Sequence, residues 1–541
     1  MKREGKILIL FGAGVLVFLF LNLGDRPLWG VEGRWAEGVR EMMLRGDWWV
    51  PTINGVPHIT KPLIPYWLIR FSASLFGGLN EFTVRLPVVL CALATLLAFY
   101  ALAGVFLERY WALVATGMLA TSWGFVAYAR VAQSEIYQLA GITAALAFYF
   151  RYRERTSLVG YLGFWFSAVF AALSKGLPGL AVPVLTAAVD LARHRNPRHL
   201  NAKNLLAAGT ALAVYLGHYY ALSRAVGSEL PFHLFVRENL LQAVSPYDNR
   251  EPFYVYFLYV PELLLPWTPF FLMALAWGMG QWRNLSERER LVLLSIAAVF
   301  LLFTLARARR SYYILPILPF CVLLTSTYLS RVIRTPGRYS LGLFYLYGAL
   351  TFFAGVALCL APFIWGWLSL PPLSLRLKLA VTLAGMITTV SLVLCVLRST
   401  PPWGLIFSYL AMAVVGLSVL TPTLTPPSEK AFGRELARLA RARGETPCAL
   451  GKVSANLFFY LEWPGPIPVF QTPEDWPSRC RMVFFRESLY RKETLLGTAL
   501  REKGFRVYGL ADPLLSRDTN KNYLLAVPGK WRLKWPFRLY P

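Results

Sequence analysis

The sequence is poor in acidic residues. Only 29 of its 541 residues are Asp or Glu, against 55 Lys or Arg, which gives a formal net charge of +26. A surplus of this size can mark a nucleic-acid-binding protein, but the chain carries no signature of a nucleic-acid-binding module. It is 56% hydrophobic, and the cytoplasmic loops of membrane proteins are enriched in Lys and Arg. We therefore attribute the charge to such loops and to anionic lipid headgroups, and expect no nucleic-acid partner.

Cysteine and histidine are also scarce, with six and five residues. No C-x-x-C or H-E-x-x-H spacing occurs, so the sequence gives no support for a structural zinc site. Four cysteines lie in apolar segments, where Cys usually acts as a small hydrophobic residue. The other two, Cys448 and Cys480, lie in the polar C-terminal stretch. They either form a disulfide in an oxidising compartment or remain free thiols, and the sequence leaves both open.

Long apolar runs fill the first 420 residues. Runs of roughly 20 apolar residues match the thickness of a bilayer core, so we predict a polytopic α-helical membrane protein. No small-residue cleavage site follows the first run, so we expect it to be kept as a span. The thirteen predicted spans are 7–23, 82–106, 110–128, 134–150, 159–174, 176–192, 204–224, 252–279, 290–306, 311–330, 340–366, 376–397 and 403–420.

With the N-terminus inside, an odd number of spans places the C-terminal part outside. Lys and Arg gather in the predicted inner segments, such as 151–155 and 193–203, as the positive-inside rule requires. The predicted organisation is a membrane domain, 1–420, with outer loops at 24–81 and 225–251, followed by an outer domain, 421–541.

Helix and strand alternate in the outer domain, which predicts an α/β fold. Helices are expected at 428–442 and 495–503, and strands at 482–485 and 505–508. This part has no Gly-rich phosphate loop and no nucleophile motif. We therefore interpret it as a cap or docking domain rather than the catalytic one.

The first outer loop combines charged and aromatic residues next to the bilayer. Charged and apolar residues alternate at helical spacing over 32–43, which predicts a short amphipathic helix. Breakers crowd 46–62, and 63–76 forms a second amphipathic segment rich in Trp and Tyr. Carboxylates, a lysine and aromatic side chains thus meet in one loop, as half of an active site for a lipid-linked substrate would require.

Two acids on the outer side are candidate bases, since ionisable groups at membrane depth are costly and usually functional. Glu32 starts the loop helix and is either a base or acceptor-positioning group, or a carboxylate favoured by the helix dipole. Glu135 opens the fourth span and either faces the same cavity or pairs with Arg130.

Four other polar residues of the first loop have simpler interpretations. Glu41 and Arg45 are four apart and predict an ion pair, and Glu37 and Glu41 are expected on a solvated face. His58 is the one histidine of this loop, and a lone histidine is more often structural.

Several cations fall on the predicted outer side, against the positive-inside rule. They suit a phosphate or diphosphate headgroup, because Arg offers forked donors and Lys a point charge, although snorkelling to lipid phosphates is the alternative. Asp248, Asn249, Arg250 and Glu251 precede a span and are placed to close over a substrate. Tyr312 and Tyr313 add hydroxyls beside the arginine cluster. The candidate phosphate-binding residues are Lys61, Lys175, Arg250, Arg307, Arg310, Tyr312 and Tyr313.

Motifs in four places carry a family resemblance. The first loop contains Glu32-Gly33-Arg34-Trp35-Ala36-Glu37, Gly46-Asp47-Trp48, Asn54-Gly55-Val56-Pro57 and Lys61-Pro62. Further motifs are Ser174-Lys175-Gly176, Asn249-Arg250-Glu251-Pro252-Phe253 and Ser311-Tyr312-Tyr313-Ile314-Leu315-Pro316. Together they resemble the bacterial aminoarabinose transferases that modify lipid A. That family belongs to glycosyltransferase family 83 and the protein O-mannosyltransferase-like superfamily, and has the GT-C fold.

The resemblance implies an inverting transfer at the periplasmic face of the bacterial inner membrane. The donor is then a sugar on undecaprenyl phosphate, and the acceptor lipid A or another periplasmic glycan. By resemblance, Lys61, Arg250 and one of Tyr312 and Tyr313 hold the leaving phosphate, and Glu135 stands where the family has an Asp. Residues expected to position the sugar or the acceptor are Arg34, Glu37, His58 and Asn249. Membrane lipids are the remaining expected partners, and we expect a monomer.

Three positions depart from the family pattern. The usual catalytic Asp is replaced by Val31, so the base is Glu32 or Glu135, or none is needed. A phosphate acceptor is already ionised near neutral pH, because its second pKa is about 6, whereas a sugar hydroxyl needs a base. Thr60 and Asn249 replace an acid and a histidine, so the zinc site of a relative is lost and we expect no cofactor.

We predict a transferase of this kind, and two rivals remain. A transporter or flippase for the same polyprenyl-linked lipid would show inverted repeats and a polar site at the midplane. A catalytically silent relative is the second rival, because of Val31.

Overall fold

A computed structural model of the protein describes residues 2–194, 197–334, 338–367, 374–397, 400–425, 428–477, 480–511, 516, 518–534 and 536–540. Internal contacts divide the chain into two compact units. The larger unit comprises Met1–Leu23, Thr60–Pro65 and Arg85–Leu420, and the smaller one Gly24–Ile59, Tyr66–Val84 and Thr421–Pro541. Most of the first predicted outer loop thus groups with the C-terminal part, which the sequence does not reveal.

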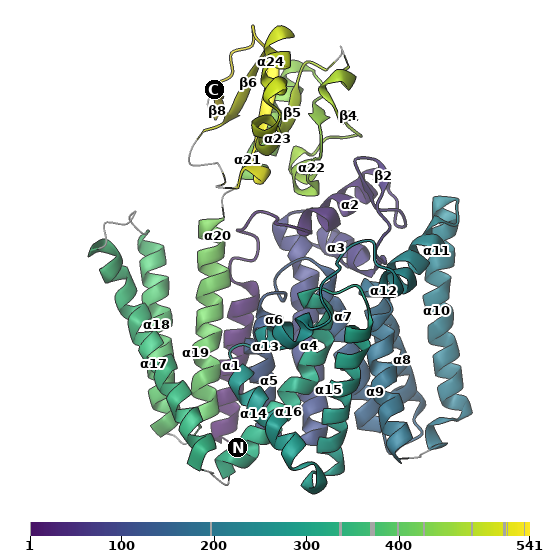
Figure 1. Ribbon diagram of the computed structural model, residues 1–541, viewed down its shortest axis with the longest axis vertical. Coiled ribbons are helices and arrows are strands. Elements are labelled where there is room, and N and C mark those ends of the chain that lie inside the picture. The colour runs from purple at the N-terminus through teal and green to yellow at the C-terminus, as the bar shows by residue number, and fades with distance from the viewer. Residues whose placement is uncertain are drawn as a thin grey trace. The chain divides into compact units, whose positions relative to one another are not determined.

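The larger unit consists mainly of long helices that lie side by side in Figure 1. Its helices are α1 (Lys2–Phe20), α4 (Glu81–Phe106), α5 (Arg109–Thr121), α6 (Trp123–Val126), α7 (Ser134–Tyr152), α8 (Leu158–Lys175), α9 (Pro178–His194), η1 (Pro197–His199), α10 (Ala202–Val226), α11 (Leu230–Phe235), η2 (Val236–Leu241), α12 (Gln242–Val244), α13 (Val255–Leu264), α14 (Thr268–Gly280), η3 (Trp282–Asn284), α15 (Glu287–Leu305), η4 (Ser311–Ile317), α16 (Leu318–Arg334), α17 (Arg338–Trp367), α18 (Leu375–Leu397), α19 (Pro401–Ala413) and η5 (Val414–Leu420).

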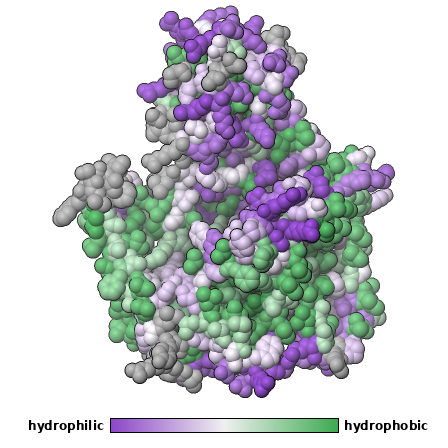
Figure 2. Space-filling view, in the orientation of Figure 1, coloured by the Kyte–Doolittle hydropathy of each residue, from purple (hydrophilic) through white to green (hydrophobic). Residues whose placement is uncertain are grey.

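These helices are those of an integral membrane protein. Within the described residues, seven are long and apolar enough to cross a bilayer, or up to eight if one bent pair is a single span. Figure 2 shows hydrophobic side chains covering the outside of the long helices and hydrophilic ones gathered at their lower ends. The long helices expose large apolar side chains, such as Leu97 of α4 and Leu379 of α18.

The predicted span at 252–279 is not one straight helix. Helices α13 and α14 occupy this stretch and meet at an angle of 118°. Pro266 lies between them and has no N–H to continue the hydrogen-bond ladder of a helix. Trp267 then fixes the corner, because its side chain is fully buried and its indole N–H donates to Thr121 Oγ1 over 3.0 Å.

The smaller unit contains both amphipathic helices that the sequence predicts in the first loop. They are α2 (Glu32–Arg45) and α3 (Ile64–Leu75), the latter starting two residues before this unit's next segment. Between them lies a hairpin of β1 (Thr52–Ile53) and β2 (Val56–Pro57), paired antiparallel. Asn54 and Gly55 form its turn with φ of 52° and 78°, the left-handed conformation that an Asn-Gly turn favours.

The C-terminal part forms a six-stranded sheet with the strand order β4-β3-β5-β7-β6-β8. Strand β3 runs parallel to β4 and β5, and the remaining neighbours are antiparallel. The strands are β3 (Cys448–Leu450), β4 (Val469–Phe470), β5 (Val483–Arg486), β6 (Phe505–Leu510), β7 (Tyr523–Pro528) and β8 (Phe537–Leu539). The helices are α20 (Thr421–Leu424), α21 (Ser428–Arg443), α22 (Ala455–Leu461), η6 (Pro473–Asp475), α23 (Glu487–Lys492), α24 (Thr494–Glu502) and η7 (Thr519–Lys521).

Both faces of this sheet are covered. Neighbouring residues of a strand point to opposite faces, and Phe484 and Phe485 accordingly lie in two separate hydrophobic clusters. Cys448 and Cys480 are joined by a disulfide within the second cluster, which settles the alternative that the sequence leaves open. The predicted helices and strands of this part are confirmed as α21, α24, β5 and β6.

Specific contacts explain why the first loop belongs with the C-terminal part. Helix α2 packs on α22 so closely that a Cβ at Gly33 would lie 2.6 Å from Asn456 Cα. The Leu28 N–H donates to the Tyr460 hydroxyl over 2.6 Å. Asn54 and Ile467 exchange two hydrogen bonds, of 3.0 and 2.8 Å.

The predicted solvated face of α2 is wrong. Glu37 is 1% exposed and Glu41 8% exposed, because the hairpin and the C-terminal part cover this side of the helix. Glu37 forms a bidentate pair with Arg40 at 2.7 Å, and Arg40 also reaches the Trp463 carbonyl. Burial raises the pKa of Glu37 to about 7, against the opposing effect of Arg40. The predicted pair of Glu41 and Arg45 is present at 3.5 Å.

Candidate active site

The centre of the candidate site is a buried ion pair between the ends of two helices. Helices α7 and α8 follow each other closely along the chain, so the start of α7 and the end of α8 meet. There Lys175 Nζ lies 3.2 Å from Glu135 Oε1, and the two side chains are only 13% and 6% exposed. The other carboxylate oxygen, Oε2, is buried and has no hydrogen-bond partner within the described residues.

The pair answers the question that the sequence leaves open for Glu135. Its ion-pair partner is Lys175, whereas Arg130 donates to the carbonyl oxygens of Phe18 and Leu21 over 2.8 and 2.6 Å. A buried carboxylate with one engaged and one unengaged oxygen is held in position and can still accept a proton or a hydrogen bond.

Two tyrosine rings surround the ammonium group of Lys175. Its Nζ lies 5.1 Å from the ring centroid of Tyr312 and 5.2 Å from that of Tyr313, within the range of cation–π attraction. Both tyrosines belong to η4, and their rings contact each other edge to face. Tyr128 extends the aromatic wall by contacting Tyr312, with 6.2 Å between the centroids.

The turn that carries Lys175 is fixed by a segment far along the chain. Asn239 of η2 accepts a hydrogen bond from the Leu177 N–H through Oδ1 over 2.8 Å. The same oxygen lies where a Cβ of Gly176 would come within 2.5 Å, and Gly176 has a φ of 141°. Glycine at this position therefore allows the close approach of η2, and with it the placement of Lys175.

A second lysine–glutamate pair lies beside the first. Lys61 Nζ is 3.5 Å from Glu238 Oε2, and Lys61 keeps 37% of its side chain exposed. Glu238 also pairs with Arg237 at 3.0 Å and accepts from the Tyr247 hydroxyl over 2.6 Å. Burial acts to raise the pKa of Glu238, but Tyr247, Lys61 and Arg237 together hold it below its ordinary value. Lys61 lies close enough to Lys175 for its positive charge to act on the ammonium group of Lys175.

Asn249 joins the loop before α13 to the arginine cluster before α16. Its Nδ2 donates to the Tyr313 hydroxyl over 3.1 Å, its Oδ1 accepts from Arg310 Nε, and its carbonyl accepts from the Arg309 N–H over 2.8 Å. Arg250 donates through Nε to the Pro246 carbonyl over 2.6 Å and is exposed. The Arg307 N–H donates to Ala243, and the Arg307 side chain is exposed.

All seven predicted phosphate-binding residues lie in the larger unit, as do Glu135 and Asn249. Contacts connect Lys175, Tyr312, Tyr313 and Arg310 with Glu135 and Asn249, and Lys61 pairs with Glu238. Arg250 and Arg307 are exposed and contact Pro246 and Ala243 instead. Glu32, Arg34, Glu37 and His58 belong to the smaller unit. Glu32 is fully buried there, where it accepts from the Trp29 N–H over 2.9 Å and pairs with Arg26 at 3.0 Å. Arg34 is exposed and His58 half-buried.

The sequence does not identify two residues of the candidate site, Glu238 and Tyr247. The available signal was an acid in a predicted outer loop that faces several cations, but nothing in the sequence pairs Glu238 with Lys61, which is 177 residues away. Among the described residues, no group of three or more His, Cys, Asp or Glu side chains is placed to hold a metal ion.

Known proteins resemble this chain in sequence and in fold. Residues 60–220 match the family described as dolichyl-phosphate-mannose-protein mannosyltransferase. An undecaprenyl phosphate-alpha-4-amino-4-deoxy-L-arabinose arabinosyl transferase of Edwardsiella ictaluri is 29% identical over 364 residues, which is 65% of this chain and 64% of the relative. The same enzyme of Pectobacterium carotovorum is 31% identical over 341 residues, 60% of this chain and 58% of that one. These matches span less than two thirds of the relatives' own length.

A solved structure covers nearly the whole chain. It is the crystal structure of ArnT from Cupriavidus metallidurans bound to undecaprenyl phosphate, with a TM-score of 0.73 and 19% identity. The similarity covers 96% of this chain and 97% of ArnT. The chain is thus similar in sequence to the aminoarabinose transferases and shares the fold of ArnT.

Proposed function

We propose that this protein is an inverting glycosyltransferase that moves a sugar, aminoarabinose or a related one, from undecaprenyl phosphate to lipid A or another periplasmic glycan. The similarity to the arabinosyl transferases supports this assignment. The observation that carries it is the buried pair of Glu135 and Lys175, whose carboxylate keeps one oxygen unengaged beside a second lysine and two tyrosines.

The donor phosphate would bind within reach of both Lys61 and Lys175. Lys61 and Lys175 supply charge, the hydroxyls of Tyr312 and Tyr313 supply donors, and the exposed arginines 250, 307 and 310 extend the basic surface. Glu238 and Glu135 balance the two lysines, so an anionic phosphate oxygen can replace a carboxylate as the partner of either one. Each lysine is thus held in place by a carboxylate oxygen whose position a phosphate oxygen could occupy.

The transfer itself would be a single displacement. An acceptor oxygen attacks the anomeric carbon as the bond to the phosphate oxygen breaks, and the electron pair leaves with undecaprenyl phosphate, which inverts the configuration. If the acceptor is a hydroxyl, its proton passes to Glu135 Oε2. If the acceptor is a lipid A phosphate, the attacking oxygen is already ionised.

Glu135 suits the role of base better than Glu32. Glu32 already accepts from a backbone N–H and a guanidinium, the pattern of a carboxylate that stabilises the start of a helix. Positioning of the sugar or the acceptor by Arg34, Glu37, His58 and Asn249 stays a proposal. Glu37 and Asn249 are engaged with Arg40 and Tyr313, which favours a supporting role for both.

The membrane topology that goes with this function is thirteen spans with the site and the C-terminal part in the periplasm. Seven long apolar helices and the bent pair α13 and α14, all among the described residues, support a polytopic arrangement of this kind. The disulfide between Cys448 and Cys480 supports an oxidising compartment for the C-terminal part. We further propose a monomer that needs no cofactor.

The test is transfer by the purified protein from a labelled undecaprenyl-phosphate sugar to lipid A. Glu135→Gln should lower turnover at least about a hundredfold for a hydroxyl acceptor, with donor binding retained. Glu32→Gln should act mainly on stability, and Glu229→Gln, an exposed outer-loop acid, is the matched control. No transfer by the native protein, with lipid movement across vesicles instead, would establish the flippase alternative. Full transfer by Glu135→Gln to a hydroxyl acceptor would show that Glu135 is not the base.

A further inference from the structure

A polar cavity lies at the end of the larger unit opposite to the candidate active site. It has a volume of about 350 Å³ and lies between the last turn of α4, the start of α5, the start of α15 and the last turns of α16. One continuous span, Ser311–Arg334, links the two sites, with Tyr312 at its start and Arg331 and Arg334 at its end. At 1.5 Å per residue the separation is roughly 30 Å, about the thickness of a bilayer core.

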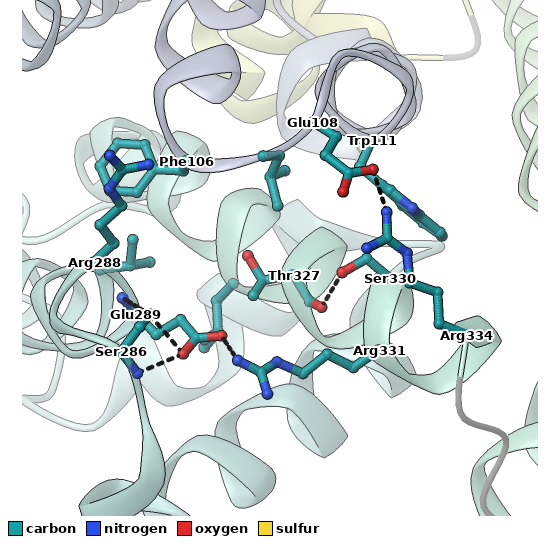
Figure 3. Close-up of a pocket in the computed structure, with 13 residues that line it drawn as sticks. Phe106, Glu108, Trp111, Ser286, Arg288, Glu289, Thr327, Ser330, Arg331 and Arg334 are labelled. Atoms are coloured by element: carbon teal, nitrogen blue, oxygen red, sulfur yellow. Dashed lines mark hydrogen bonds and ion pairs between the residues drawn. The ribbon is translucent and has the colours of Figure 1, made fainter.

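The lining of this cavity is apolar inside and basic at the mouth. Trp111, Val292 and Leu324 are at most 5% exposed and form the inner wall. The arginines are Arg288, Arg331 and Arg334, against two acids, Glu108 and Glu289. In Figure 3 the pairs Arg331–Glu289 and Arg334–Glu108 stand on either side of Thr327 and Ser330.

Glu289 and Glu108 differ in their exposure and in their hydrogen-bond partners. Glu289 is 9% exposed and also accepts from Ser286, where it completes the capping box of α15. Glu108 is 69% exposed and its partner Arg334 53% exposed, and such surface pairs contribute at most about 1 kcal/mol. An incoming anion can therefore take Arg334 from Glu108 at little cost, while Glu289 stays in place as part of the helix start.

An apolar stripe on α4 leads to this cavity. Positions 90, 94, 97, 101 and 104 are exposed and follow each other at helical spacing. They are Leu, Ala, Leu, Ala and Gly, so the stripe is smooth, and it ends next to Phe106 and Leu107, which line the cavity. A hydrocarbon chain that lies along this stripe brings its headgroup to the mouth of the cavity, where Arg288 donates to the Val105 carbonyl of α4 over 2.6 Å.

We propose that this cavity binds an anionic glycerophospholipid, with the phosphodiester between Arg288, Arg331 and Arg334 and one acyl chain along α4. Basic pockets between membrane helices are known to bind such headgroups. The volume of about 350 Å³ suits a headgroup of this size. The site does not depend on the transferase function, because it lies at the opposite end of α16 and involves neither the sugar donor nor its acceptor.

The test uses the purified full-length protein, stripped of lipid in detergent, with native mass spectrometry and thermal unfolding after addition of phosphatidylglycerol. The double variant Arg288→Ala/Arg334→Ala should weaken binding at least about tenfold, because it removes two charge-assisted contacts. Arg151→Ala, an exposed arginine of α7 that does not line the cavity, is the matched control and should bind as the native protein does.

A variant of opposite sign separates binding from folding. Glu108→Gln removes the competing carboxylate of Arg334 and should strengthen phosphatidylglycerol binding about two- to fivefold, which a folding defect cannot do. Equal binding of phosphatidylcholine, equal weakening by Arg151→Ala, or an equal effect of soluble glycerol phosphate in place of the lipid would each overturn the proposal. Selective binding of phosphatidylglycerol with both variant effects supports it.

Discussion

Replacing Glu135 by Gln should destabilise the protein unless a phosphate is bound. At 3.2 Å and an effective dielectric constant of about 20, the attraction between Glu135 and Lys175 is about 5 kcal/mol. Some of this is recovered, since Gln avoids the cost of burying a carboxylate and the rings of Tyr312 and Tyr313 keep their hold on the ammonium. We expect a net loss of about 2–4 kcal/mol in the free energy of unfolding.

Undecaprenyl phosphate should repair this defect if its phosphate binds Lys175. The lipid would then stabilise Glu135→Gln more than the native protein, because the phosphate replaces the missing carboxylate as the partner of Lys175. Lys175→Met should be destabilised by a similar amount, since it leaves the buried carboxylate unpaired, but the lipid should not rescue it. The measurement is unfolding by SDS in mixed micelles, with and without undecaprenyl phosphate, and with Glu229→Gln as control.

One outcome would show that the lipid phosphate does not bind Lys175. If the lipid shifts the unfolding of Glu135→Gln and Lys175→Met by the same amount, then Lys175 does not contact the phosphate. The pair would then be a structural link between α7 and α8, and the double variant Glu135→Gln/Lys175→Met should be more stable than either single variant.

Three further predictions concern other parts of the protein. The pKa of Glu238 is lowered on folding, so its contribution to stability is present above its ordinary value of 4.5 and is lost as the pH falls through the lowered value; Glu238→Gln should flatten this acid limb of a stability-versus-pH curve. Gly33→Ala should destabilise the smaller unit by about 1–3 kcal/mol, because the added methyl group meets the backbone of Asn456, whereas Gly465→Ala, at an exposed position with no neighbouring atoms, should cost less, as thermal unfolding would show. Cys448→Ser should lower stability by about 2–4 kcal/mol, and reduction of the native protein by dithiothreitol should reproduce that loss.

The sequence by itself determined which segments form helices and that the long apolar ones lie in a membrane. Apolar runs of bilayer length must satisfy their backbone polar groups within helices, so the helical character of these segments follows from local composition. The amphipathic helices 32–45 and 64–75 follow from spacing in the same way. The candidate phosphate site was also within reach, because cations on the outer side of a membrane protein need a reason to be there.

Contacts between distant segments required the tertiary structure. Which lysine pairs with which glutamate depends on how α7, α8 and η2 pack, and Lys61 and Glu238 carry no mutual signal along the chain. The burial of Glu37 and Glu41 follows from the hairpin and the C-terminal part that cover α2, whereas helical spacing alone predicts a solvated face. Local patterns fix secondary structure because its forces act over a few residues, but the partner and protonation of a charged group depend on whatever the folded chain brings within a few ångströms.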